Sequence, residues 1–441
     1  YIIKPFTEFS QKSLVETLPS TGGTQPLWMF VSHWWGEVFH HFLACIKTAI
    51  LDFSWNSRDS HEARGGGMTM DTPIWICAFA NNQHDLDSAV TSDPLESSFV
   101  KAMKEARFRV LSILDAAGTV FTRIWCAFEL FLTMILRKQL MDELKSTESI
   151  GSWAVYTHTT EHDFKGQTRE AVGIIPGGVP GEVASETSDR EKHFPLDLII
   201  QSIRNTNVQH AQASIEYDRI HILNSIIRNN DLDATPPDDH PAYELVNDAV
   251  RGAFAMSNTA IRAALKHGRD GTWKMVMEAR SKSAFDGKYD LNFKLFHPPL
   301  SSRQAFDSVS HVPLTCTGLN IWNAKGETAE VAVEGLIDWL GQKKNVKSAR
   351  CCHCYVEDEA KRRALGSQLA NVLAKRHTQS IEYLNISFSH LMDLQNLSNW
   401  TAAIEKMTNL KSLYCYGGGL PEDEQEIVRQ AASHVEYVDI T

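Results

Sequence analysis

The chain has 441 residues, of which 43% are hydrophobic and 22% are charged, and these fractions are ordinary for a folded globular protein. This length predicts two or three domains. The formal net charge of -11, with no long basic run, argues against general binding to nucleic acid. No apolar run reaches the roughly 18 residues needed to cross a bilayer, so no transmembrane segment is expected.

The first third of the chain alternates short apolar strands with helices. Strands are predicted at residues 28–32, 74–79, 109–114 and 152–156. Helical periodicity separates them at residues 39–50, 98–107 and 121–136. The strands are apolar along their whole length, which indicates parallel pairing with both faces buried. We therefore expect an α/β domain in which Phe30, Ile76 and Ile113 lie on adjacent strands of one parallel sheet.

The middle of the chain changes character twice. Residues 157–193 are polar and are typical of loops. Helical periodicity then dominates residues 194–227 and 243–280, on either side of a Pro- and Asp-rich break at 231–241. The predicted domains are an α/β domain at 1–193, a helical connector at 194–285 and a strand-helix segment at 286–441.

The last segment contains a weak internal repeat. Short strands are predicted at residues 314–321, 346–352, 381–386, 410–415 and 435–440, with helical patterns between them. The steps of roughly 25 to 35 residues are those of strand-helix solenoids. The pattern resembles the longer, helix-containing leucine-rich repeats (LRR), and a small α/β sheet is the alternative. The repeat interpretation predicts that the strands containing Leu384, Leu413 and Val438 are neighbours in one parallel sheet.

One carboxylate, Glu129, lies in the otherwise almost wholly apolar run 121–136. A carboxylate in low-dielectric surroundings is costly to keep charged, so it must be paired, hydrogen-bonded, at an edge or functional. Trp125 lies about one helical turn earlier and shares its face. An aromatic ring beside an acid suits a bound heterocycle or sugar. The alternative is an amphipathic helix whose Glu pairs with a neighbouring Arg.

Polar and aromatic residues gather where the predicted strands end. Ser32, His33 and Trp34 come at the end of the first strand, and Asp115 follows the third. Open parallel sheets bind ligands at the carboxyl ends of their strands. These side chains, together with Glu129, are therefore the candidate site.

The order of these motifs resembles the Toll/interleukin-1 receptor (TIR) domain, a flavodoxin-like α/β fold. The run Phe30-Val31-Ser32-His33 looks like the first-strand motif of that family. The run Arg123-Ile-Trp-Cys-Ala-Phe-Glu-Leu130 is similar to its third-helix motif, in which Glu follows the Trp of Trp-Cys by four residues. The resemblance covers about residues 27–156. In catalytically active TIR domains the matching Glu supports cleavage of the nicotinamide-ribosyl bond of NAD.

Two functions follow from the resemblance. In one, the chain is an intracellular signalling or interaction protein, a protein-binding module or accessory subunit of a larger assembly. In the other it is an NAD-cleaving hydrolase, with NAD as substrate and Glu129 as catalytic acid. The residues expected to contact NAD are Ser32, His33, Trp34, Asp115 and Trp125. The two interpretations differ in whether Glu129 faces an open cleft or the core.

Metal binding and disulfide bonding are not expected. Cys351-Cys352-His353-Cys354 cannot chelate one ion from an extended strand, because successive side chains alternate between its faces. His40 and His41 are predicted to lie on a helix surface. The eight cysteines are irregularly spaced, which favours reduced thiols in an intracellular compartment. Because the sequence begins at Tyr1 without a signal-like segment, targeting information is expected to be missing and the organelle is not predicted.

Overall fold

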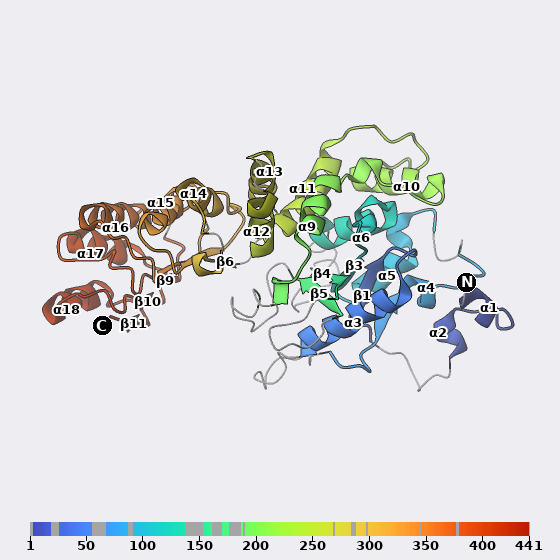
Figure 1. The fold of residues 1–441 in the computed structure, drawn as a ribbon, viewed down its shortest axis with the longest axis horizontal. Coiled ribbons are helices and arrows are strands. Elements are labelled where there is room, and N and C mark those ends of the chain that lie inside the picture. The colour runs from blue at the N-terminus through green and yellow to red at the C-terminus, as the bar shows by residue number, and fades with distance from the viewer. Residues whose placement is uncertain are drawn as a thin grey trace. The chain divides into compact units, whose positions relative to one another are not determined.

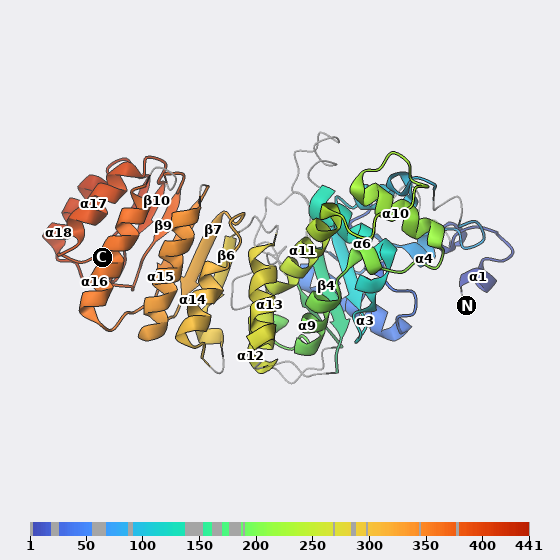
Figure 2. The same cartoon turned by 90° about the horizontal axis from the view of Figure 1, so that it is seen from above.

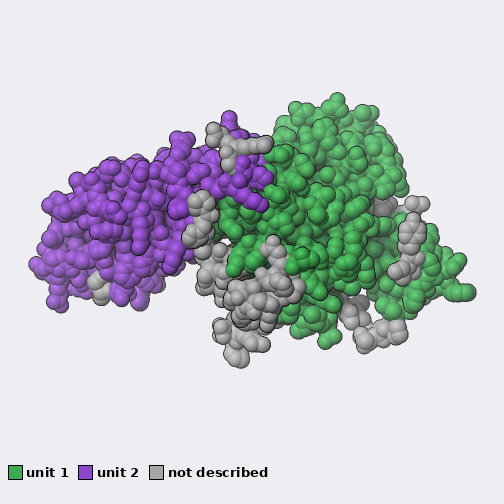
Figure 3. Space-filling view, viewed as in Figure 1, with its two compact units in different colours: residues 1–263 green, residues 264–441 purple. Residues whose placement is uncertain are grey.

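The computed structural model describes residues 3–18, 26–54, 68–86, 91–136, 153–160, 170–175, 187, 190–267, 270–283, 288–296, 299–343, 345–375 and 379–440. The chain is a mixed α/β protein that divides into two compact units, residues 1–263 and 264–441 (Figure 3). Each unit has its own largely or wholly parallel sheet. No helix within the described ranges is long and apolar enough to cross a membrane.

The first unit is built on a five-stranded sheet with the order β2-β1-β3-β4-β5. Strands β1, β3, β4 and β5 of this sheet are labelled in Figure 1. Its strands are β1 (Met29–His33), β2 (Ile74–Ile76), β3 (Val110–Leu114), β4 (Trp153–His158) and β5 (Ala171–Ile174). The first four are parallel, and β5 is antiparallel to β4. Phe30 pairs with Trp75 of β2 and Val110 of β3. The predicted parallel sheet, with Phe30, Ile76 and Ile113 on adjacent strands, is therefore confirmed.

Helices cover this sheet because their apolar faces match its buried strands. They include α3 (Phe39–Ser54), α4 (Cys77–Ala80), α5 (Ser98–Glu105) and α6 (Ile124–Phe131). The apolar face of α3, including Phe42 and Phe53, joins the core formed with β1, β3 and β4. A π-helical turn, Leu132–Leu136, continues α6. Two short helices, α1 (Ile3–Phe6) and α2 (Leu14–Thr17), precede the sheet.

The edge strand β5 lies in the segment that its polarity predicted to be loop. Only four residues are strand, Ala171-Val-Gly-Ile174, which is too short for a periodicity signal. The Tyr156 ring packs across Gly173, where an added Cβ would lie 2.4 Å from the ring. The same tyrosine hydroxyl donates to Asp52 of α3 at 2.7 Å. This strand is therefore fixed by contacts with β4 and α3 that are distant in sequence.

The helices of the predicted connector fall in both units. They are α9 (Leu196–Asn205), α10 (Glu216–Ile227), α11 (Pro241–Ala255), α12 (Asn258–His267) and α13 (Asp270–Ser281). The first three belong to the first unit, where α10 and α11 contact α6. Buried apolar residues on α9 and α11, such as Ile199 and Phe254, account for this packing. The expected boundaries at 193 and 285 therefore do not coincide with the division at 263.

The second unit contains a six-stranded parallel sheet with the order β11-β10-β9-β8-β7-β6. Its strands are β6 (Lys288–Asn292), β7 (Gly318–Trp322), β8 (Ser348–Cys352), β9 (Tyr383–Asn385), β10 (Ser412–Tyr414) and β11 (Tyr437–Asp439). Leu413 pairs with both Leu384 and Val438, so the predicted neighbouring strands are confirmed. The sequence pattern missed β6, in which polar and apolar residues alternate over only five positions.

Helices lie along one side of the second sheet (Figure 2). They are α14 (Ser302–Ser310), α15 (Glu327–Gln342), α16 (Glu359–Leu373), α17 (Leu397–Lys406) and α18 (Glu422–Ala431). Asn323, His353 and Phe388 each follow a strand with left-handed φ of 58°, 53° and 55°. Their backbone N–H groups donate to carbonyls of the next strand-helix step at 3.2, 3.1 and 2.7 Å. An uncommon conformation thus recurs at the same place in successive steps.

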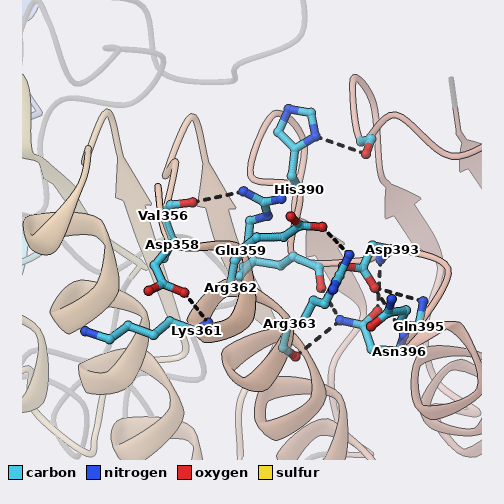
Figure 4. Close-up of polar contacts among 12 residues, drawn as sticks. Val356, Asp358, Glu359, Lys361, Arg362, Arg363, His390, Asp393, Gln395 and Asn396 are labelled. Carbon is cyan, nitrogen blue, oxygen red and sulfur yellow. Dashed lines mark hydrogen bonds and ion pairs between the residues drawn. The ribbon is translucent and has the colours of Figure 1, made fainter.

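Side-chain contacts join successive helices of this unit (Figure 4). Asp358 caps α16 by accepting from the backbone N–H of Lys361 at 2.9 Å. Arg363 of α16 forms ion pairs with Glu359 in its own helix and with Asp393 before α17, the latter at 3.1 Å. These contacts fix α16 relative to the chain that leads into α17.

Candidate functional site

A cavity of about 690 Å³ opens in the first unit at the carboxyl ends of β1 and β2. This is the edge where an open parallel sheet is expected to bind ligands. Its walls come from the segments after β1 and β2, from α6 and from α10. Among the lining residues are His33, Trp34, Trp35, Cys77, Asn81, Phe99, Arg123, Trp125, Cys126, Glu129, Gln212, Ser214, Tyr217, Asp218 and His221.

Glu129 is the buried acid of this cavity. Its side chain is 4% exposed, and its Oε2 has no hydrogen-bond partner among the described residues. Burial raises the pKa of Glu129 to about 8, and the nearby Ser32 hydroxyl opposes this shift without cancelling it. Arg123, one candidate for pairing with this acid, instead donates to Ser214 Oγ at 2.9 Å. One carboxyl oxygen is therefore left without a hydrogen-bond partner among the described residues, in a side chain that lines the cavity.

Aromatic rings form much of the wall. The Trp125 ring stacks on Phe99 at a centroid distance of 4.8 Å, and its Nε1 donates to Asp218 of α10 at 3.1 Å. Trp35 is 57% exposed, and its Nε1 donates to Cys77 Sγ at 3.0 Å. These contacts hold two indoles in place before any ligand arrives. Flat rings of this kind suit stacking against a heterocycle.

His33 and the thiols of the cavity are neutral groups. Burial lowers the pKa of His33 to about 4. Burial likewise raises the pKa of Cys77 to about 12 and that of Cys126 well above its usual value, with Glu129 adding to both shifts. A thiol is nucleophilic only as thiolate, so neither cysteine is suited to attack a substrate near neutral pH. Among Glu129, His33, Cys77 and Cys126, Glu129 is therefore the group whose pKa lies nearest neutrality.

Four of the residues predicted from sequence line the cavity: His33, Trp34, Trp125 and Glu129. Ser32 lies behind the wall, buried beside Glu129, and its Oγ is also without a hydrogen-bond partner among the described residues.

Asp115 is placed differently from the other predicted residues. It is not among the cavity residues, because its carboxylate caps the turn that follows β3. It accepts from the backbone N–H of Thr119 at 2.7 Å and from the Thr119 hydroxyl at 2.6 Å. Both acceptor oxygens are thus engaged in local structure.

The wall formed by α10 was missed by sequence reasoning. Tyr217, Asp218 and His221 approach the cavity from a helix about 90 residues beyond α6 in sequence. His221 is buried, and its Nε2 lies 2.8 Å from Asp233 Oδ1. The sequence signal for this wall was a His and an Asp on a helix that otherwise shows apolar periodicity. Nothing in the periodicity says which distant strand edge such residues will meet.

The fold and cavity define a mixed α/β protein with a ligand-sized space at the carboxyl edge of a parallel sheet. No family model and no curated protein matches the sequence. Among solved structures, the C-terminal domain of tropomodulin from Caenorhabditis elegans is similar to part of the chain at 14% identity. The match covers 34% of this chain and 83% of that one, with a TM-score of 0.25. A similarity at this level assigns neither fold nor function.

Proposed function

We propose that the first unit is a TIR-like domain that cleaves the bond between nicotinamide and ribose in NAD. The sheet order β2-β1-β3-β4-β5 supports a flavodoxin-like fold, with β5 reversed relative to an all-parallel sheet. The motifs that resemble the TIR family, around Ser32 and around Trp125 and Glu129, meet at one place. This convergence supports the family resemblance independently of the residue matches.

The observation that carries the proposal is the unpartnered Oε2 of Glu129 beside the cavity. Cleavage of the nicotinamide-ribosyl bond leaves positive charge on the ribose anomeric carbon, and water then completes hydrolysis to ADP-ribose and nicotinamide. A carboxylate fixed at short range stabilises this developing charge. The cationic nicotinamide ring itself favours the ionised form of Glu129 once it is bound. The acid is therefore protonated in the empty cavity and ionised when substrate arrives.

The other lining groups suit the rest of a dinucleotide. Trp35 and Trp125 present flat rings, and Arg123 supplies a cation that can pair with phosphate oxygens. The volume of about 690 Å³ lies within the range of roughly 300–1,000 Å³ typical of small-molecule sites. The cavity thus combines an acid, aromatic surfaces and a guanidinium, which are the groups that NAD requires.

The direct test is nicotinamide release from NAD by the full chain, measured over a pH series and at several protein concentrations. The carboxylate is the active form, and its proton is lost with a pKa of about 8 in the free protein. We therefore expect kcat/KM to rise roughly tenfold per pH unit well below 8 and to level off above it. Absence of nicotinamide release at every concentration, or a kcat/KM that falls as pH rises, would contradict the proposal.

The second unit supports a further candidate function, binding of another protein chain. On the sheet face away from the buried Leu384 and Leu413, Tyr383 and Tyr414 lie 5.2 Å apart between ring centroids. The Arg350 guanidinium lies 4.5 Å from the Tyr383 ring centroid. Tyrosine and arginine are enriched among the residues that dominate protein interfaces.

This second function predicts loss of partner capture in a specific pair of variants. Tyr383→Ala with Tyr414→Ala should abolish crosslinking of a discrete partner to the full chain, since both rings lie on the exposed face. Glu405→Ala on α17 is the control and should retain the partner, as identified by mass spectrometry. If the double tyrosine variant and the wild type capture the partner equally, this face is not the binding surface.

A further inference from the structure

Three histidines that the NAD proposal does not use meet at another part of the first unit. His40 and His41 lie in the first turn of α3, and His158 is the last residue of β4. One ring nitrogen from each lies within 4.8 Å of the others. The rings of His41 and His158 stack at a centroid distance of 3.6 Å, and His40 meets His41 edge-on at 4.2 Å. Imidazole is the commonest side-chain ligand for transition metals.

A buried carboxylate stands behind this cluster. Glu37 Oε1 lies 3.7 Å from His41 Nδ1, and the Glu37 side chain is only 5% exposed. Its Oε2 has no hydrogen-bond partner among the described residues. The cost of removing this ionised carboxylate from water is not offset unless a cation lies nearby.

We propose that His40, His41 and His158 bind a divalent transition-metal ion, with Zn²⁺ the best match to three imidazoles. Glu37 orients His41 through Nδ1, which leaves Nε2 free for the metal, in the carboxylate-histidine arrangement common around zinc. Ligand nitrogens around tetrahedral zinc lie about 3.4 Å apart, given Zn–N distances of about 2.0–2.1 Å. The His41 and His158 rings stack at an interplanar angle of 21°, so both side chains must rotate to point a nitrogen at one ion, and His40, which is exposed, has room to turn. The fourth position stays open to water or another ligand.

The segment that carries Glu37 also carries Trp34 and Trp35 of the cavity wall. A bound ion therefore fixes the start of α3 and the segment that leads from it to the cavity, but it contributes no group to NAD cleavage.

The test is metal titration of the full chain after removal of bound metal with a chelator. Isothermal titration with Zn²⁺ should give one site per chain, and Co²⁺ should give the visible bands of a tetrahedral ion with nitrogen and oxygen ligands. His158→Ala and His41→Ala should each weaken Zn²⁺ binding at least tenfold. Glu37→Gln keeps the shape of the side chain and should weaken it to a smaller extent. His210→Ala, an exposed histidine elsewhere in the same unit, is the control and should bind like the wild type.

Several outcomes would overturn the site. Wild-type affinity in the double variant His41→Ala with His158→Ala would show that these rings are not ligands. A thiolate-to-cobalt charge-transfer band would assign the ion to cysteines instead. Equal weakening by His210→Ala would indicate non-specific binding to surface imidazoles. Without metal, the variants should unfold at the same temperature as the wild type. A lower unfolding temperature would identify a variant that fails to fold, separately from any loss of Zn²⁺ affinity. Nicotinamide release is not a readout here, so this site and the NAD proposal can fail independently.

Discussion

Glu129→Gln is expected to lower nicotinamide release by about 10²–10³-fold, the range typical for loss of one preorganised electrostatic contact in an active site. The amide keeps the size of the side chain but cannot carry the charge that stabilises the developing cation. The loss should appear in kcat as well as in kcat/KM, because the interaction strengthens as the bond breaks. Release of nicotinamide from NAD by purified full-length variants measures both.

The same substitution is expected to stabilise the fold at alkaline pH. The pKa of Glu129 is raised from 4.5 to about 8, so between these values the native state holds a proton that the unfolded state has lost. Stability of the wild type therefore falls as pH rises through this window. The amide of the variant does not titrate. Its free energy of unfolding should therefore exceed that of the wild type by at most about 5 kcal/mol near pH 8, at 1.36 kcal/mol per pKa unit. Urea unfolding at pH 5 and pH 8 measures this difference.

Asp115→Asn is the control for the activity measurement. Its carboxylate caps a turn outside the cavity, so the substitution should leave nicotinamide release close to wild type. A loss of activity in Glu129→Gln accompanied by lower stability at pH 8 would indicate structural damage rather than removal of a catalytic charge. Equal rates for wild type and Glu129→Gln would leave protein binding as the better account of this chain.

Local signals in the sequence were sufficient for the framework of the site. Apolar strands such as 109–114 predicted parallel pairing, and their ends marked the edge where the cavity lies. The spacing of Trp125 and Glu129 placed both on one helix face, and both line the cavity. These inferences succeeded because each depends on a few neighbouring residues and on the fixed geometry of helices and parallel sheets.

Contacts between distant segments could not be predicted from these local signals. Asp218 reaches Trp125, and His158 reaches His41, only because the chain folds back over itself. Strand position alone also assigned Asp115 to the site, although its local hydrogen bonds turn it away from the cavity. Periodicity identifies a buried helix face but not the segment that packs against it. The α10 wall and the histidine cluster could therefore not be predicted from the sequence.

Gly366→Ala is expected to destabilise the second unit by about 3 kcal/mol. Gly366 lies on the buried side of α16, where an added Cβ would stand 1.9 Å from the Leu391 carbonyl oxygen and 2.5 Å from Asn396 Nδ2. That carbonyl accepts from Asn396 Nδ2 at 2.8 Å and from Trp400 Nε1 at 3.3 Å. The methyl group must therefore displace backbone and disturb two buried hydrogen bonds, each effect being worth roughly 1–3 kcal/mol.

Gly341→Ala provides the matched comparison, because Gly341 lies in α15 with nothing within 4 Å of its added Cβ. Alanine is favoured over glycine inside a helix by roughly 0.5–1 kcal/mol, so this variant should be neutral or slightly stabilised. Denaturant unfolding followed by near-ultraviolet circular dichroism, to which Trp400 contributes together with the other tryptophans of the chain, compares the two variants. If Gly366→Ala unfolds like Gly341→Ala, then α16 does not pack against the Leu391 carbonyl, and the contact that joins these two strand-helix steps is wrong.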